Sequence, residues 1–140
     1  MQNPKRYILS LLVWICLVPS ISAAETIQWQ GFDIHYTTFS SMLIPPEVAA
    51  SHNIARANNR IVTNISILKN GEPQTATITG RNSNLLNQLY TMQFTEVVES
   101  SAVYYLANQL IDERDTLRFE IQISPSAIDD TYTLEFMRTY

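Results

Sequence analysis

Alternation of apolar and polar residues restricts the fold of this chain more than any other feature of its sequence. In residues 116–124 every second residue is large and apolar: Leu117, Phe119, Ile121 and Ile123. Successive side chains of a β-strand point to opposite faces of the sheet, so a period of two predicts a strand with one buried face. Residues 131–140 repeat the pattern. The chain is therefore expected to form sheets that each bury one face.

Five further segments have the β-branched and aromatic composition of strands: 27–38, 61–68, 74–79, 88–97 and 102–110. The alternation changes phase at Gly31, which predicts a bulge or a break into two strands. Asn70-Gly71 suits the positive φ angles of a tight turn, so it is expected to close a hairpin onto residues 74–79. A short helix is predicted at residues 46–50, with Pro46 at its first position.

Together these segments predict an all-β fold, a two-sheet, immunoglobulin-like antiparallel β-sandwich of about seven strands. A small barrel is the alternative architecture. The likeness to immunoglobulin domains concerns architecture only, because the cysteine pair that marks those domains is absent from the sequence.

The N-terminus has the organisation of a secretory signal. Lys5 and Arg6 precede an apolar run of 12 residues, 7–18, and the small residues 22–24 (Ser-Ala-Ala) follow. The run is shorter than the roughly 20 residues of a membrane-spanning helix, which favours a cleaved signal over a membrane anchor.

Cleavage is expected after Ala24. It divides the chain into a signal peptide, 1–24, and a single β-sandwich domain, 25–140, that does not span the membrane. Cys16, the one cysteine, leaves with the signal, so packing alone has to hold the exported domain together. The domain keeps seven of the nine Lys and Arg side chains against thirteen carboxylates, a net charge of −6. Its basic residues form no cluster, so nucleic acid is not an expected partner.

Few residues of the domain belong to a recognisable catalytic, cofactor-binding or metal-binding motif. Its three glycines are too scattered for a phosphate-binding loop, and no serine lies in a nucleophile elbow. Two histidines remain, and a metal-assisted hydrolase would have to combine four residues: Asp33, His35, Glu47 and His52. The spacing of known zinc motifs is missing, so polar surface histidines are the preferred interpretation. No catalytic, cofactor-binding or metal-binding residue is therefore assigned, and no cofactor is expected.

The preferred function is a non-enzymatic binding or accessory module, with the small metal-assisted hydrolase as the alternative. Its partner would be a protein or a glycan. Adjacent Tyr104 and Tyr105 point to opposite faces, so an outward tyrosine beside Trp29 or Tyr90 would form an exposed aromatic patch. A central strand with one tyrosine half-buried by its neighbours is the preferred interpretation. Recognition through an exposed edge, such as the C-terminal strand with Arg138 as its charged guard, is the second route.

Short motifs along the chain resemble a family of exported proteobacterial proteins. They are residues 34–36 (Ile-His-Tyr), 39–41 (Phe-Ser-Ser), 46–49 (Pro-Glu-Val-Ala), 54–56 (Ile-Ala-Arg), 61–69, 102–107 (Ala-Val-Tyr-Tyr-Leu-Ala) and 116–119 (Thr-Leu-Arg-Phe). The family is known as domain of unknown function 4426. The resemblance implies a periplasmic location in a Gram-negative bacterium. It implies no activity and transfers no functional residue.

Processing of the signal is directly testable. The exported protein is expected to begin at Glu25 and to lack Cys16, because the small residues before Glu25 suit signal peptidase. Mass spectrometry of a periplasmic extract measures this. A mature mass that retains residues 1–24, or a lipid adduct on Cys16, would contradict it.

Overall fold

The computed structural model describes residues 24–112 and 114–140. Most of the expected signal peptide, with Cys16, lies outside the described residues. None of the helices in the described part of the chain has the length and hydrophobicity to cross a bilayer.

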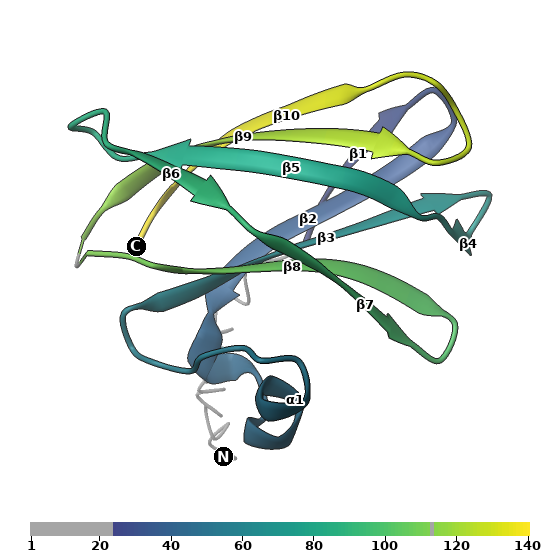
Figure 1. The fold of residues 1–140 in the computed structure, drawn as a ribbon. Coiled ribbons are helices and arrows are strands. Elements are labelled where there is room, and N and C mark those ends of the chain that lie inside the picture. Colours follow the sequence, from purple (N-terminus) through teal and green to yellow (C-terminus); the bar gives the residue numbers. More distant parts are fainter. Residues whose placement is uncertain (1–23, 113) are drawn as a thin grey trace, which may run out of the picture.

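The structure is an all-β, two-sheet antiparallel sandwich, which confirms the predicted fold class (Figure 1). Its strands are β1 (Glu25–Trp29), β2 (Phe32–Ser40), β3 (Arg60–Lys69), β4 (Glu72–Pro73), β5 (Ala76–Ser83), β6 (Leu89–Met92), β7 (Phe94–Glu99), β8 (Ala102–Leu110), β9 (Thr116–Pro125) and β10 (Tyr132–Thr139). A 3₁₀ turn, η1 (Ser41–Leu43), and a short helix, α1 (Pro46–Ser51), join β2 to β3. Pro46 opens α1 as predicted.

One sheet has the strand order β1-β2-β3-β8-β7, with β4 added to β3; the other has the order β10-β9-β5-β6. The chain changes sheet between β4 and β5, between β6 and β7, and between β8 and β9. Two of the segments that the sequence predicted as single strands are divided in the structure. Gln30 and Gly31 both have positive φ and form a turn that separates β1 from β2, and Gln93 separates β6 from β7. These divisions and the short β4 raise the strand number above the expected seven.

The predicted hairpin after Asn70-Gly71 is only partly correct. Both turn residues have the expected positive φ, and β4 returns along β3. However, β4 ends at Pro73, and one further backbone hydrogen bond, from the Gln74 N–H to the Ile67 carbonyl at 2.8 Å, is formed before the chain leaves β3. The predicted partner strand, β5, lies in the opposite sheet between β9 and β6.

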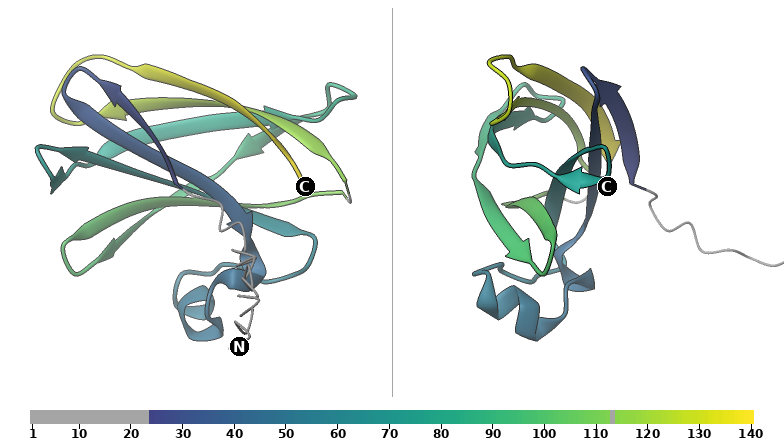
Figure 2. Two further views of the ribbon diagram at one scale, coloured as in Figure 1. Left: turned by 180° about the vertical axis from the view of Figure 1, so that it is seen from behind. Right: turned by 90° about the vertical axis from the view of Figure 1, so that its right-hand side faces the viewer.

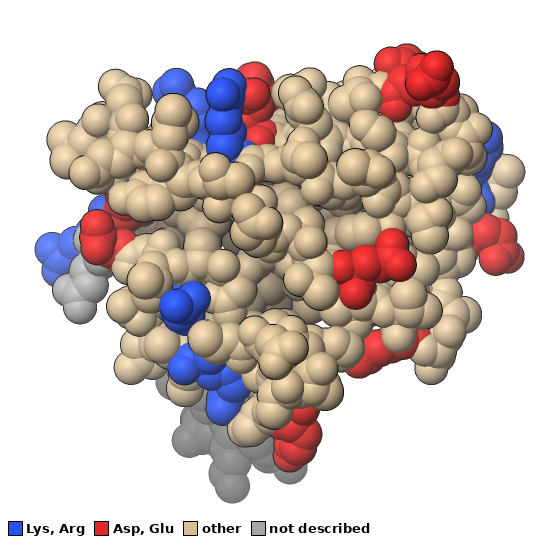
Figure 3. Space-filling view, in the orientation of Figure 1, with Lys and Arg blue, Asp and Glu red and all other residues tan. Residues whose placement is uncertain are grey.

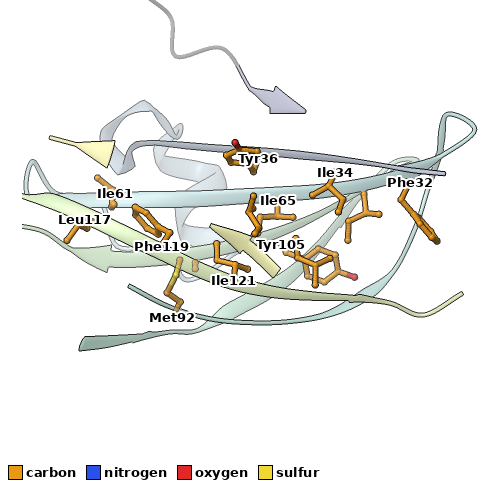
Figure 4. Packing of buried hydrophobic residues seen from close by; sticks show 14 residues of the cluster. Phe32, Ile34, Tyr36, Ile61, Ile65, Met92, Tyr105, Leu117, Phe119 and Ile121 are labelled. Atoms are coloured by element: carbon orange, nitrogen blue, oxygen red, sulfur yellow. The ribbon is translucent and has the colours of Figure 1, made fainter. Parts of the chain in front are cut away.

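The inner faces of both sheets form the core (Figure 4). As predicted, alternate residues of β9 point inward, and Phe119 is fully buried. The ring of Phe119 stacks on Phe136 of β10 at 4.6 Å, and Phe136 in turn contacts Tyr36 of β2 at 4.9 Å. A second, smaller cluster lies on the outer face of the first sheet, where Ile44 and Ala49 cover Val62.

β1 and β10 lie together along one side of the sandwich, as the right-hand view in Figure 2 shows. Contacts between their side chains close this side. Trp29 of β1 contacts Tyr132 of β10, with ring centroids 5.5 Å apart. Arg138 of β10 forms an ion pair with Glu25 of β1. On the opposite side, the backbone itself passes from β6 into β7 (Figure 1).

A buried tyrosine links the two sheets by hydrogen bonds. The Tyr105 hydroxyl on β8 accepts a hydrogen bond from the Ala76 N–H of β5 and donates one to Glu96 of β7, both at 2.7 Å. Burial raises the pKa of Tyr105 to about 12; the Ala76 bond partly opposes this shift and the Glu96 bond adds to it. The neutral phenol is therefore the form that the fold requires.

Replacement of one core residue and its exposed neighbour tests the phase of β9. Phe119→Ala is expected to lower the free energy of unfolding by about 3–5 kcal/mol, because it leaves a cavity in the core. Arg118→Ala, on the solvent face, is expected to cost less than about 1 kcal/mol. Denaturant melts of the two variants measure the difference, and the reverse order would show that the strand faces the other way.

The pH dependence of the free energy of unfolding tests the role of the Tyr105 hydroxyl. The unfolded tyrosine ionises near pH 10 and the folded one near pH 12, so its contribution is complete below pH 10 and is lost as the pH rises toward 12. Tyr105→Phe is expected to cost about 1–3 kcal/mol at neutral pH, because it leaves the Ala76 N–H unpaired. Denaturant melts from pH 8 to 12 should show a shallower loss in the variant. Equal slopes for both proteins would contradict this assignment.

Candidate functional site

The loop that joins β5 to β6, residues 84–88, is organised by one side chain. Asn84 Oδ1 accepts hydrogen bonds from the N–H groups of Leu86 and Gln88, both at 3.0 Å. Asn84 Nδ2 donates to Gln88 Oε1 at 2.6 Å, and the Asn87 N–H donates to the Asn84 carbonyl. Asn87 takes the positive φ that asparagine tolerates. The loop satisfies its own polar groups, so its conformation does not depend on burial of its leucines.

The leucines of this loop point into solvent. Four large side chains form what we call the leucine hairpin, with exposed fractions of 71, 79, 68 and 44 %: Leu85, Leu86, Leu89 and Tyr90. Residues 82–95 contain no charged side chain. Accordingly, the corner of the molecule that the hairpin occupies is free of acidic and basic residues in Figure 3. Sequence reasoning missed this surface, although its signal, two leucines between asparagines, is present.

A cavity of about 220 Å³ lies beneath the leucine hairpin, between the two sheets. Tyr90, Leu110, Ile111 and Leu117 are its apolar and aromatic lining residues. Asn82 of β5 and Gln109 of β8 also line it, and Asn82 Nδ2 donates to Gln109 Oε1 at 2.6 Å. The core of the sandwich thus ends here in a pair of polar side chains.

The loop from β8 to β9 adds negative charge to this cavity. Asp112 and Asp115 complete its lining. Arg114, from the same loop, lines instead a neighbouring cavity of about 510 Å³ together with Arg60 and Tyr140. In Figure 3 the acidic side chains of this loop lie directly below the uncharged corner. The cavity therefore has apolar walls, amide groups and two carboxylates.

The four residues of the hydrolase alternative do not come together. Asp33 and His35 share the outer face of β2, where His35 Nδ1 lies 2.7 Å from Thr26 Oγ1. His52 follows α1, and its Nε2 lies 3.3 Å from Glu99 of β7. Three strand spacings separate β2 from β7, a distance of about 14 Å. Glu47 lies in the first turn of α1. Within residues 24–112 and 114–140, no three His, Cys, Asp or Glu residues are grouped to hold a metal ion.

The residues of the alternative aromatic patch are dispersed, and the preferred interpretation, a central strand with one half-buried tyrosine, agrees with the structure. Tyr105 is buried, while Tyr104 is half-buried on the outer face of β8. Trp29 packs on Phe32 and Tyr132 at the opposite edge of the sheet. Tyr90 is the aromatic residue of this set that lies at the candidate site.

The C-terminal strand β10 is an edge strand, as expected. Its edge faces β1, and Arg138 is occupied by the ion pair with Glu25 and by contact with the Phe136 ring. Tyr140 donates a hydrogen bond to Thr38 of β2 at 2.8 Å. These contacts cover the end of β10, which makes the leucine hairpin the better candidate surface.

Two solved proteins have a similar structure. A DUF4426 family protein from Pseudomonas aeruginosa aligns with a TM-score of 0.78 and 27 % identity, covering 84 % of this chain and 94 % of that one. A copper-bound variant of FetP from uropathogenic Escherichia coli aligns with a TM-score of 0.60 and 12 % identity, covering 84 % and 95 %. FetP as isolated gives 0.56 and 11 %, covering 84 % and 93 %. The likeness to FetP shows the fold alone.

No curated protein matches the sequence. The family model described as "Domain of unknown function (DUF4426)" matches residues 27–140, which is nearly the whole β-sandwich. The chain belongs to the DUF4426 family, as its short motifs indicated.

Proposed function

We propose that this chain is an exported periplasmic recognition module that binds a protein partner, without catalysis, through the leucine hairpin. The observation that carries the proposal is the exposure of Leu85 and Leu86 in the β5–β6 loop and of Leu89 at the start of β6. Contiguous exposed apolar surface is characteristic of protein interaction sites, because water covers it at a free-energy cost.

The order of the loop strengthens the proposal. Asn84 Oδ1 accepts hydrogen bonds from two backbone N–H groups of the loop and Asn84 Nδ2 donates to the Gln88 side chain, so contacts within the loop hold the leucines in their exposed positions. A pre-organised surface loses less conformational entropy on binding, which increases the affinity for a given contact area. Leucine side chains offer no hydrogen bonds to sugar hydroxyls, so this surface suits a protein better than a glycan.

The metal-assisted hydrolase has less support. It requires Asp33 and His35 of β2 to share a site with His52, which contacts Glu99 of β7, and about 14 Å separates these two strands. Ligand bonds near 2 Å do not bridge such a distance. The described residues of this chain contain no group of three His, Cys, Asp or Glu residues that would hold a metal ion, and the bound copper is a property of the FetP variant. Copper binding is therefore not part of the proposed function.

Export to the periplasm is supported by two independent observations. The first is the signal-like organisation of residues 1–24. The second is the match to the DUF4426 family, because the resemblance to that family implies a periplasmic location.

Site-specific photo-crosslinking in the periplasm tests the proposal. A crosslinker at Leu86 is expected to capture one defined partner, and a crosslinker at Leu89 should capture the same one. Leu43 is a matched control, because it is 74 % exposed but lies on η1. Leu85→Ser should abolish capture while changing stability by less than about 0.5 kcal/mol. Equal capture from Leu43, or capture that survives Leu85→Ser, would refute the proposal.

A further inference from the structure

The cavity beneath the leucine hairpin contains a buried polar atom without a partner. Asn82 is 1 % exposed, and its Oδ1 forms no hydrogen bond within the described residues. The amide nitrogen is already engaged with Gln109, so the oxygen is the group left to accept. A buried unpaired acceptor destabilises the folded state, and leucine at an inward position of β5 would avoid that cost. An asparagine that weakens the core at the floor of a cavity suggests a use for its oxygen.

The remaining groups of the cavity favour a positively charged ligand. Asp112 and Asp115 accept hydrogen bonds but donate none when ionised. The face of the Tyr90 ring attracts cations as well. Ile111 and Leu117 provide apolar walls for a short alkyl chain. Carboxylates, an acceptor and apolar walls together match an alkylammonium group: a methylene chain that ends in three N–H donors.

The position of the cavity connects it with the leucine hairpin, since Tyr90 belongs to both. We propose that the cavity lined by Asn82, Asp112 and Asp115 receives a lysine side chain of the partner protein, whose apolar residues pack on the leucine hairpin. This inference deepens the proposed function and rests on it. The hairpin supplies contact area, and the cavity supplies selectivity for a basic anchor residue.

A small probe tests the cavity independently of the partner. Pentylammonium copies the lysine side chain, and pentan-1-ol is its neutral counterpart. In NMR titrations of the domain at low salt and pH 7, pentylammonium is expected to shift the resonances of Tyr90, Leu117 and Asp115 saturably. It should bind roughly tenfold more tightly than pentan-1-ol. Added salt should weaken binding, because it screens the carboxylates.

Charge variants identify the site. Asp115→Asn is expected to weaken pentylammonium binding about fivefold. Asp129→Asn removes the same charge from the turn between β9 and β10, outside the cavity, and should leave binding unchanged. Equal effects of the two variants would indicate attraction by net charge alone and would overturn the inference.

Variants of the Asn82–Gln109 pair distinguish a role of Asn82 in binding from a role in folding. Replacing both partners of the amide pair, Asn82→Leu with Gln109→Leu, should leave the melting temperature unchanged or raise it, while pentylammonium binding falls at least fivefold. A lowered melting temperature with unchanged binding would show that the pair serves the fold only and would overturn the inference.

The failure of this inference and that of the proposed function are distinguishable. Leu85→Ser should abolish partner crosslinking but leave pentylammonium binding intact. If crosslinking from Leu86 holds and pentylammonium does not bind, the hairpin recognises a partner and the lysine anchor is wrong. A shift of the same resonances by N-acetylglucosamine, without one by pentylammonium, would point to a glycan site and also refute the lysine anchor.

Discussion

Contact between the inner faces of the two sheets is the interaction on which the rest of this molecule depends. The β-sandwich, residues 25–140, has no cysteine, so no disulfide contributes to its stability. Phe119 lies at the centre of the contact, stacked on Phe136, which itself touches Tyr36 of the opposite sheet. Burial of such aromatic residues provides the largest favourable free energy per residue that a small domain has available. The loops, the cavity and the leucine hairpin all take their positions from this contact.

The sandwich is apolar through most of its length and polar at one end. Along β5 the inward positions pass from Ile78 to Gly80 and then to Asn82, where the packing gives way to the amide pair with Gln109. The end with the weaker core carries the exposed leucines, the acidic loop and the cavity. Such a division between a stable region and a binding region is common, because groups suited to recognition are seldom the groups that pack best.

Local patterns predicted the strands well because period-two alternation reflects burial of one face. The division at Gly31 and the turn at Asn70-Gly71 were also visible, since each depends on backbone angles that few residues adopt. The placement of β5 was not predictable. Pairing with β9 rather than β3 is decided by contacts between residues far apart in the sequence, and a turn dipeptide carries no information about them. The candidate site was not predicted for a related reason: Asn82 and Asp115 line the same cavity only because β5 pairs with β9.

The two sides of the sandwich differ in what an opening motion would have to break. Where β6 runs through Gln93 into β7, a covalent backbone joins the sheets, and they cannot part there without extending the chain. Where β1 meets β10, the contacts described here are between side chains: a pair of aromatic rings and an ion pair. Partial opening of the domain should therefore separate β1 from β10 first, with the β6–β7 connection as the hinge. The leucine hairpin and its cavity lie next to the hinge, so a bound partner would be carried by the part of the molecule that moves least.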